Sequence, residues 1–161
     1  MQSKTLHIVR HGKALQDYRS IRDDDRPLIE KGIINNTFVA KQLYMQHVTP
    51  GLIISSHAAR ALHTAHIFAR MMHYPHERVQ VNENLYLNGE NETYSILKSL
   101  PDELETVMIV GHNPDVTFLA NRLAKCIISS ISTSGVVTIS FETNRWSEIY
   151  NSTIKYEVLS S

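Results

Sequence analysis

The chain has 161 residues, 42% of them hydrophobic, which is enough for one domain with a core and too few for two. Sixteen basic and sixteen acidic residues cancel, so no overall field would draw the chain to nucleic acid or to an anionic membrane. A single cysteine, Cys126, excludes an intramolecular disulfide framework, and the sequence has no signal-peptide pattern and no long apolar run. We therefore expect one cytoplasmic domain, residues 1–161, and a monomer that binds neither nucleic acid nor membrane.

Short apolar runs typical of strands alternate along the chain with longer segments of helical periodicity. The expected elements are, in chain order, a strand at 6–9, a helix at 29–46, a strand at 52–55, a helix at 58–72, a strand at 79–81, a helix at 92–100, a strand at 107–110, a helix at 115–125, and strands at 135–141 and 146–156. The last two strands are expected to be antiparallel and joined through Thr143 and Asn144, and Asn113 is expected to cap the helix that follows it. This alternation predicts an α/β fold: a three-layer αβα sandwich with a mostly parallel central sheet, helices on both faces and no cap domain.

Polar and charged residues gather at the ends of the first, second and fourth expected strands. They are Arg10, His11 and Gly12 after the first, Ser55, Ser56, His57 and Arg60 after the second, and Gly111, His112 and Asn113 after the fourth. Open α/β sheets bind their ligands at the carboxyl ends of their strands. We therefore expect two arginines and two histidines to converge on one crevice.

Such a crevice has the chemistry of a phosphate pocket. Guanidinium groups present forked donors that match phosphate oxygens, and helix starts add backbone N–H groups. Of two imidazoles in that pocket, one in its neutral form can attack phosphorus while the other donates to the transferring oxygens. Arg10 and Arg60 should lower the pKa of His11 and so keep it nucleophilic, and Gly12 should allow a tight backbone turn.

Three segments of the sequence resemble the motifs of one enzyme family. They are LHIVRHGKA at residues 6–14, the set Ser55, Ser56, Arg60, Ala61 and Thr64 in the family's Ser-Ser-Pro-x-x-Arg-Ala-x-Gln-Thr pattern, and the run Val110, Gly111, His112 and Asn113. Their order and spacing are those of the histidine phosphatase superfamily, also called the phosphoglycerate mutase-like superfamily. The loop at 25–32 together with GHNP resembles the short SixA phosphohistidine phosphatases, whereas His57 and His63 depart from the family's usual proline and glutamine.

The resemblance implies roles for individual residues. His11 would be the nucleophile, Arg10 and Arg60 would bind the phosphoryl oxygens, and His112 would stabilise the transition state. Gly12, Arg26 and Asn113 are further candidates for substrate binding. Glu83 is the candidate proton donor, with one of Asp23, Asp24 and Asp25 as the alternative, or no donor at all.

The implied function is phosphohistidine phosphatase activity through a covalent phosphohistidine intermediate. The segments between the motifs are short, so the pocket should be open to a phosphorylated side chain on another protein, such as a histidine-containing phosphotransfer domain. A phosphomonoesterase for a small phosphorylated metabolite is the alternative, and a non-catalytic phosphate-binding module is a third. We expect no cofactor and no metal, since arginines and histidines supply the positive charge. The pair His63 and His66 has helical spacing but lacks further ligands.

Overall fold

The computed structural model describes residues 3–17 and 19–161. Its helices are α1 (Glu30–Met45), α2 (Ala59–Met71), α3 (Glu90–Lys98) and α4 (Asp115–Ala124), and its strands are β1 (Lys4–Arg10), β2 (Leu52–Ser55), β3 (Gln80–Val81), β4 (Thr106–Gly111), β5 (Val136–Phe141) and β6 (Thr153–Leu159). Short 3₁₀ helices lie at Asp23–Asp25, His76–Arg78, Glu83–Leu85 and Trp146–Asn151. In these described residues no helix is long and apolar enough to cross a membrane.

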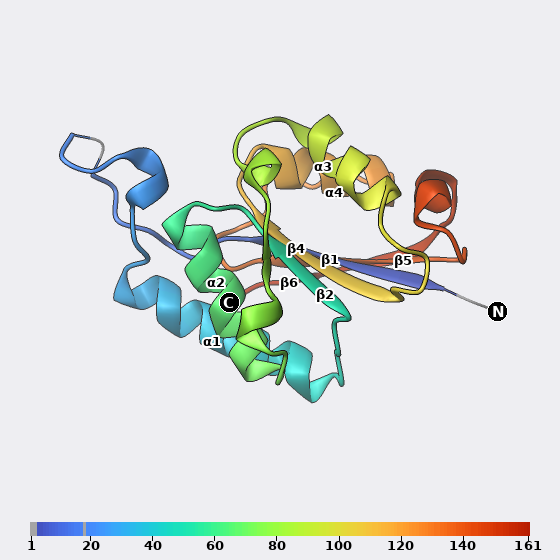
Figure 1. The fold of residues 1–161 in the computed structure, drawn as a ribbon, viewed down its shortest axis with the longest axis horizontal. Coiled ribbons are helices and arrows are strands. Elements are labelled where there is room, and N and C mark those ends of the chain that lie inside the picture. The colour runs from blue at the N-terminus through green and yellow to red at the C-terminus, as the bar shows by residue number, and fades with distance from the viewer. Residues whose placement is uncertain (1–2, 18) are drawn as a thin grey trace.

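The strands form one sheet in the order β3-β2-β4-β1-β5-β6. The pairs β1–β4, β2–β4 and β2–β3 are parallel, whereas β5 is antiparallel to both β1 and β6. Helices α3 and α4 cover one face of the sheet and α1 and α2 cover the other (Figure 1). The predicted fold class, a three-layer sandwich around a mostly parallel sheet, is confirmed.

The two faces of the sheet carry separate hydrophobic cores because side chains alternate along each strand. On β1, Leu6 and Ile8 pack in the core that also contains residues of α3 and α4, and Val9 packs in the core with residues of α1 and α2. Strands β1 and β4 are covered on both faces, as continuous apolar runs in parallel sheets predict.

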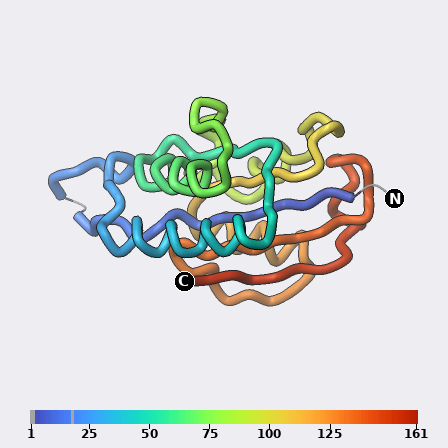
Figure 2. The backbone as a smooth tube through the Cα atoms, turned by 90° about the horizontal axis from the view of Figure 1, so that it is seen from below, coloured from blue at the N-terminus to red at the C-terminus, as the bar shows by residue number. Residues whose placement is uncertain are grey.

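Register brings the three motif segments to one edge of the sheet. Arg10 at the end of β1 is paired with Gly111 at the end of β4, and Ser55 at the end of β2 is paired with Val110. These strand ends lie beside the long loop that follows β1, which extends from one end of the molecule in both views (Figures 1 and 2). The arrangement therefore places the sequence motifs side by side.

The structure corrects the expected strand at 146–156. Residues Trp146–Asn151 form a 3₁₀ helix, and β6 begins only at Thr153. Trp146 is fully buried, its backbone N–H donates to Asp102 Oδ1 at 3.0 Å, and its indole N–H donates to the Leu104 carbonyl at 2.9 Å. The helical turn lets Trp146 and Ile149, three residues apart, enter the same core, which an extended strand would not do.

Candidate active site

A pocket of about 210 Å³ lies at the carboxyl ends of β1 and β4. It is lined by six of the residues singled out from the sequence, namely Arg10, His11, Arg26, Arg60, His112 and Asn113, and by Lys13, Ala14, Gln16, Leu87 and Thr133. Two arginines and two histidines therefore converge as expected, and Arg26 joins them from the loop after β1. Sequence reasoning missed Lys13, although it directly follows the Arg-His-Gly run.

His11 is held in a defined tautomer. Its Nδ1 lies 2.7 Å from the carbonyl oxygen of Gly12, and because a carbonyl only accepts, Nδ1 carries the hydrogen and Nε2 keeps its lone pair. Burial lowers the pKa of His11 to about 4, and the neighbouring charges of Arg60, Arg10 and Arg26 lower it in the same direction. His11 is therefore neutral at neutral pH.

His112 lies against His11, with ring centroids 5.1 Å apart. Its Nε2 is 2.8 Å from Ser56 Oγ, and this oxygen accepts a hydrogen bond from the backbone N–H of Ala58 at the start of α2. Burial, followed by the proximity of His11 and Arg60, lowers the pKa of His112 to about 2. His112 is thus a second neutral imidazole, fixed by a serine of the second motif.

The arginines are anchored through part of their guanidinium groups. Arg10 Nη1 donates to the Ile131 carbonyl at 2.9 Å, and Arg60 Nη1 donates to the Asp23 carbonyl at 2.6 Å. Within the described part of the chain, Arg10 Nε, Arg60 Nε and His112 Nδ1 are buried without a hydrogen-bond partner.

Asp23 bridges Arg26 and Arg60, the two pocket arginines that lie outside the first motif. Its Oδ1 accepts from Arg26 Nε at 3.0 Å, its Oδ2 accepts from Arg60 Nη2 at 3.0 Å, and the hydroxyl of Tyr86 also donates to Oδ2. Burial alone would raise the pKa of Asp23, but the hydrogen bonds from Tyr86 and Arg60 outweigh it and hold the pKa below its usual range. Asp23 is therefore an ionised partner of the arginines.

Tyr86 connects this carboxylate to the histidines. Its ring meets His112 edge-on at 5.2 Å between centroids and meets His57 in the same way at 4.9 Å. His57 Nε2 in turn lies 3.2 Å from Asp24 Oδ2. The residue that stands in place of the family's usual proline thus contacts Tyr86 and Asp24 beside the pocket, although it does not line the pocket itself. Sequence reasoning did not single out Tyr86, because an aromatic residue after a short strand carries no distinctive signal.

Gly12 is required by packing and not by a positive φ. A Cβ at this position would lie 2.6 Å from Asn36 Nδ2, a buried side chain that donates to Thr64 Oγ1 at 2.9 Å. The same threonine oxygen accepts from the Gly12 N–H at 3.0 Å. The Thr64 of the second motif therefore supports the loop that carries His11.

Two other candidates lie differently from the way the sequence indicated. Glu83 is exposed in the 3₁₀ helix Glu83–Leu85 and does not line the pocket, which is reached instead by Leu87. Asn113 lines the pocket but does not cap α4, because its Oδ1 accepts from the Thr117 hydroxyl at 2.6 Å and not from a backbone N–H of the helix. Its Nδ2 donates to Ser130 Oγ at 2.9 Å and to the Ile131 carbonyl at 3.0 Å. Helix α4 begins at Asp115, so Asn113 instead joins the strand end to the loop before β5.

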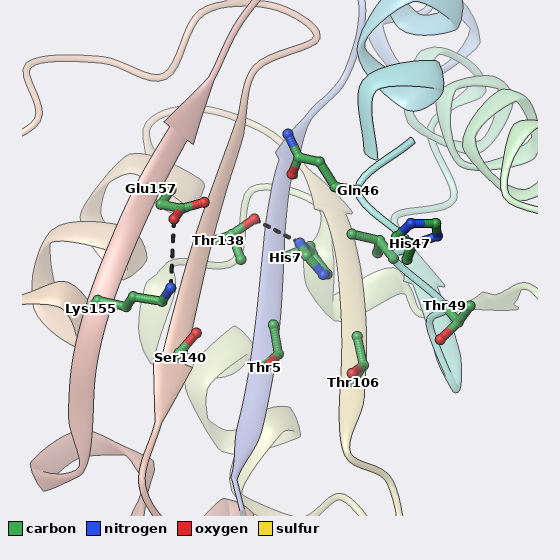
Figure 3. Close-up of a pocket in the computed structure, with 11 residues that line it drawn as sticks. Thr5, His7, Gln46, His47, Thr49, Thr106, Thr138, Ser140, Lys155 and Glu157 are labelled. Carbon is green, nitrogen blue, oxygen red and sulfur yellow. Dashed lines mark hydrogen bonds and ion pairs between the residues drawn. The ribbon is translucent and has the colours of Figure 1, made fainter. Parts of the chain in front are cut away.

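A second pocket of about 280 Å³ lies at the opposite ends of the parallel strands (Figure 3). It contains His7, whose Nδ1 is 2.7 Å from Thr138 Oγ1, together with further hydroxyl groups and no arginine. It has none of the converging guanidiniums of the first pocket, and its one lysine, Lys155, lies 3.7 Å from Glu157 Oε1. Among residues 3–17 and 19–161, no group of three or more histidine, cysteine or acidic side chains is placed to hold a metal ion.

Residues 6–106 match the family model of the histidine phosphatase superfamily, branch 1. The chain belongs to this superfamily. The match ends before His112, which the structure places against His11 in the pocket. Over 156 residues the chain is also 27% identical to an uncharacterized chloroplastic protein of Arabidopsis thaliana, covering 92% of this chain and 71% of that protein.

Solved structures share the fold over nearly their whole length. The protein histidine phosphatase SixA complexed with tungstate superposes with a TM-score of 0.83 at 21% identity, covering 97% of this chain and 96% of the other. A putative SixA from Agrobacterium tumefaciens gives 0.77 at 23% identity, with 96% and 97% covered. A mycobacterial glucosyl-3-phosphoglycerate phosphatase gives 0.72 at 16% identity, with 99% and 98% covered. The predicted resemblance to SixA is confirmed for the fold, and no cap domain is evident in the described residues.

Proposed function

We propose that this histidine phosphatase superfamily member is a phosphohistidine phosphatase that works through a phosphohistidine on His11. The observation that carries the proposal is the state of His11. Its imidazole is neutral, its Nδ1 is engaged by the Gly12 carbonyl, and its Nε2 is left to react in a pocket lined by Arg10, Arg26 and Arg60. A neutral imidazole with a fixed lone pair beside several guanidiniums is suited to attack on phosphorus.

In the first step, Nε2 of His11 attacks the phosphoryl group of the substrate. The new bond between nitrogen and phosphorus forms as the substrate's own bond from nitrogen to phosphorus breaks. The substrate imidazole leaves with that electron pair, and it leaves as a neutral ring when its other nitrogen already carries a proton. Arg10 and Arg60 bind the phosphoryl oxygens during the transfer, using donors that include their unpartnered Nε atoms.

His112 stabilises the same transfer by donating a hydrogen bond. In this mechanism the Ser56 hydroxyl, whose oxygen already accepts from the Ala58 N–H, donates to Nε2 of His112. The hydrogen of the neutral ring then resides on Nδ1, which is buried without a protein partner in the described residues. The Nδ1–H then donates to a transferring oxygen. In the second step, water attacks the phosphorus, the bond to Nε2 of His11 breaks, and inorganic phosphate leaves as the imidazole recovers its lone pair.

The size of the pocket favours a phosphorylated protein side chain as substrate. A volume of about 210 Å³ is below the ~300–1,000 Å³ of sites that enclose a small-molecule ligand. It can hold a phosphoryl group while the rest of the substrate stays outside. An imidazole leaving group needs little help from a general acid, which agrees with the exposed position of Glu83. The proposed partner is therefore a phosphohistidine-bearing protein such as a phosphotransfer domain.

Trapping the intermediate tests this proposal. The reaction with a phosphotransfer domain labelled on its phosphohistidine is stopped during turnover, and the label on this chain is examined. We expect an acid-labile, alkali-stable phosphate that is absent from His11→Ala and present in His63→Ala, which removes an exposed histidine of α2. Full turnover by His11→Ala would overturn the mechanism. A label formed only from small phosphate esters would instead assign the chain to metabolite hydrolysis.

A further inference from the structure

Strand β6 forms one edge of the sheet and is unusually suited to pairing. It is seven residues long, contains no proline, and pairs with β5 along one side, with one register irregularity between Thr153 and Lys155. No described strand pairs with its other side. Such an edge presents unpaired N–H and C=O groups along its length. Natural proteins usually cover or interrupt edges of this kind.

The side chains of β6 alternate between apolar and charged. Ile154, Tyr156 and Val158 are 58%, 43% and 54% exposed. Tyr156 and Val158 stand beside Ile139 and Val137 of β5, so they extend the face of the sheet on which α4 packs. Charged side chains occupy the opposite face, where β6 is the outermost strand in Figure 3. The strand thus has one apolar and one charged stripe.

The charged stripe consists of Lys155 and Glu157. Their side chains are 66% and 64% exposed, and Lys155 Nζ lies 3.7 Å from Glu157 Oε1 (Figure 3). Neither residue lines the pocket that contains His11. Contacts of a partner with these two residues would therefore leave the proposed catalytic residues undisturbed.

We propose that a second copy of this chain pairs antiparallel with β6 about a two-fold axis at Tyr156. In that register Lys155 faces Glu157 of the second copy, and Glu157 faces its Lys155, which gives two opposite-charge pairs on one face. On the other face Ile154 meets Val158 of the second copy, and the two Tyr156 rings meet on the axis. The patch is self-complementary, as a two-fold interface requires.

Neighbouring registers lose this complementarity. An axis at Lys155 places that lysine opposite its own copy, and an axis at Glu157 does the same with the glutamate. A shift of pairing by one residue sets the apolar stripe of one copy against the charged stripe of the other. The sequence of β6 therefore favours the axis at Tyr156, and the proposed dimer is an alternative to the monomer expected from sequence.

Charge reversal tests the pairing. Light scattering at rising concentration should give a wild-type mass approaching twice 18.4 kDa. Lys155→Glu alone or Glu157→Lys alone should weaken dimerisation by about tenfold, because each creates two like-charge pairs. The double exchange should restore the dimer, and an equimolar mixture of the two single variants should form heterodimers. Turnover should stay the same throughout.

Some outcomes would overturn the proposal. A mass of 18.4 kDa at every concentration would show that two copies do not pair through β6. A partner of the β6 edge would then have to be a strand of a different protein. Dimerisation that is insensitive to the single reversals, or that is not restored by the exchange, would place the interface elsewhere.

Cross-linking fixes the register independently. In a background with Cys126→Ser, Tyr156→Cys should form an intermolecular disulfide, because opposed residues of antiparallel strands have Cα atoms about 4.5–5.5 Å apart. Ile154→Cys is the matched control, since its copies would lie about 13 Å apart along the strands. Disulfides in both variants, or in neither, would refute the axis at Tyr156.

Discussion

Asp23 and Arg60 are joined twice, since the backbone carbonyl of Asp23 accepts from Arg60 Nη1 at 2.6 Å and its carboxylate accepts from Nη2 at 3.0 Å. Arg60 is almost fully buried, so these bonds orient a guanidinium that has few other constraints on its terminal nitrogens. The Nε atom remains without a partner in the described residues. Asp23 therefore acts on the proposed phosphate site by positioning Arg60.

Asp23→Asn should lower kcat/KM by about ten- to a hundredfold, mainly through a higher KM, because a misplaced guanidinium binds the phosphoryl group less well. The matched control is Asp25→Asn, which changes an exposed carboxylate in the same 3₁₀ helix. Steady-state kinetics on one phosphorylated substrate measure both variants. A lower KM in Asp23→Asn would contradict positioning and would show that the carboxylate competes with phosphate for Arg60.

The low pKa of His11 predicts how the protein titrates. With a pKa of about 4, His11 stays neutral from neutral pH down to about 5 and becomes protonated only as the pH falls through 4. Arg10→Gln removes one nearby charge and should raise this pKa, although the value should stay below 6.5 because burial is the larger cause. NMR titration of the His11 ring, assigned with His11→Ala, measures both. A wild-type midpoint near 6.5 would contradict the neutral nucleophile.

The sequence predicted the fold well where the pattern is local and strong. Strand Leu52–Ser55 has the bounds expected from its apolar run, because a buried parallel strand leaves few alternatives. The segment after Thr143 was predicted poorly, since the burial of Trp146 depends on its contacts with Asp102 and Leu104, more than forty residues earlier. Such long-range contacts leave no periodic signal.

The candidate site was also predicted in part, where it depends on the strand order, and missed where it depends on the fold of a loop. The parallel strand order brings His11 and His112 together, as the three motifs predicted. The partnership of Asp23 with Arg60 depends on how the loop after β1 folds back over α2, which neither spacing nor composition specifies. The sequence left open whether a carboxylate of this loop reaches the pocket, and the structure places Asp23 on its arginines.

His7 should make stability depend on pH. Burial lowers its pKa from 6.5 to about 4, so between these values the unfolded chain binds a proton that the folded chain does not. Stability is therefore lost as the pH falls from 6.5 to 4, by about 3 kcal/mol from this residue. His7→Gln, which can keep a hydrogen bond to Thr138, should show a smaller loss in urea unfolding between pH 7 and 4.

The control for this measurement is His63→Gln, which removes an exposed histidine. His11 and His112 also have lowered pKa values, but they are present in every variant, so the difference between proteins reports on His7. Equal pH dependence in His7→Gln and wild type would refute the assignment.

The last prediction concerns the leaving group and therefore the substrate class. Glu83 is exposed and does not line the pocket, and a phosphohistidine substrate needs little general-acid help. Glu83→Gln should therefore dephosphorylate a phosphotransfer domain at nearly the wild-type rate. With an alkoxide leaving group, loss of a true proton donor would cost about 10²- to 10⁴-fold.

A substrate panel on both forms separates the cases. The wild type should act faster on the phosphohistidine-bearing domain than on sugar phosphates or phosphoglycerates, and the order should be unchanged in Glu83→Gln. Asn84→Asp serves as a control for altered charge in the same exposed turn. If sugar phosphates are the better substrates of the wild type and their hydrolysis collapses in Glu83→Gln, then Glu83 must move to the pocket during turnover. The protein-side-chain assignment would then give way to hydrolysis of a small phosphorylated metabolite.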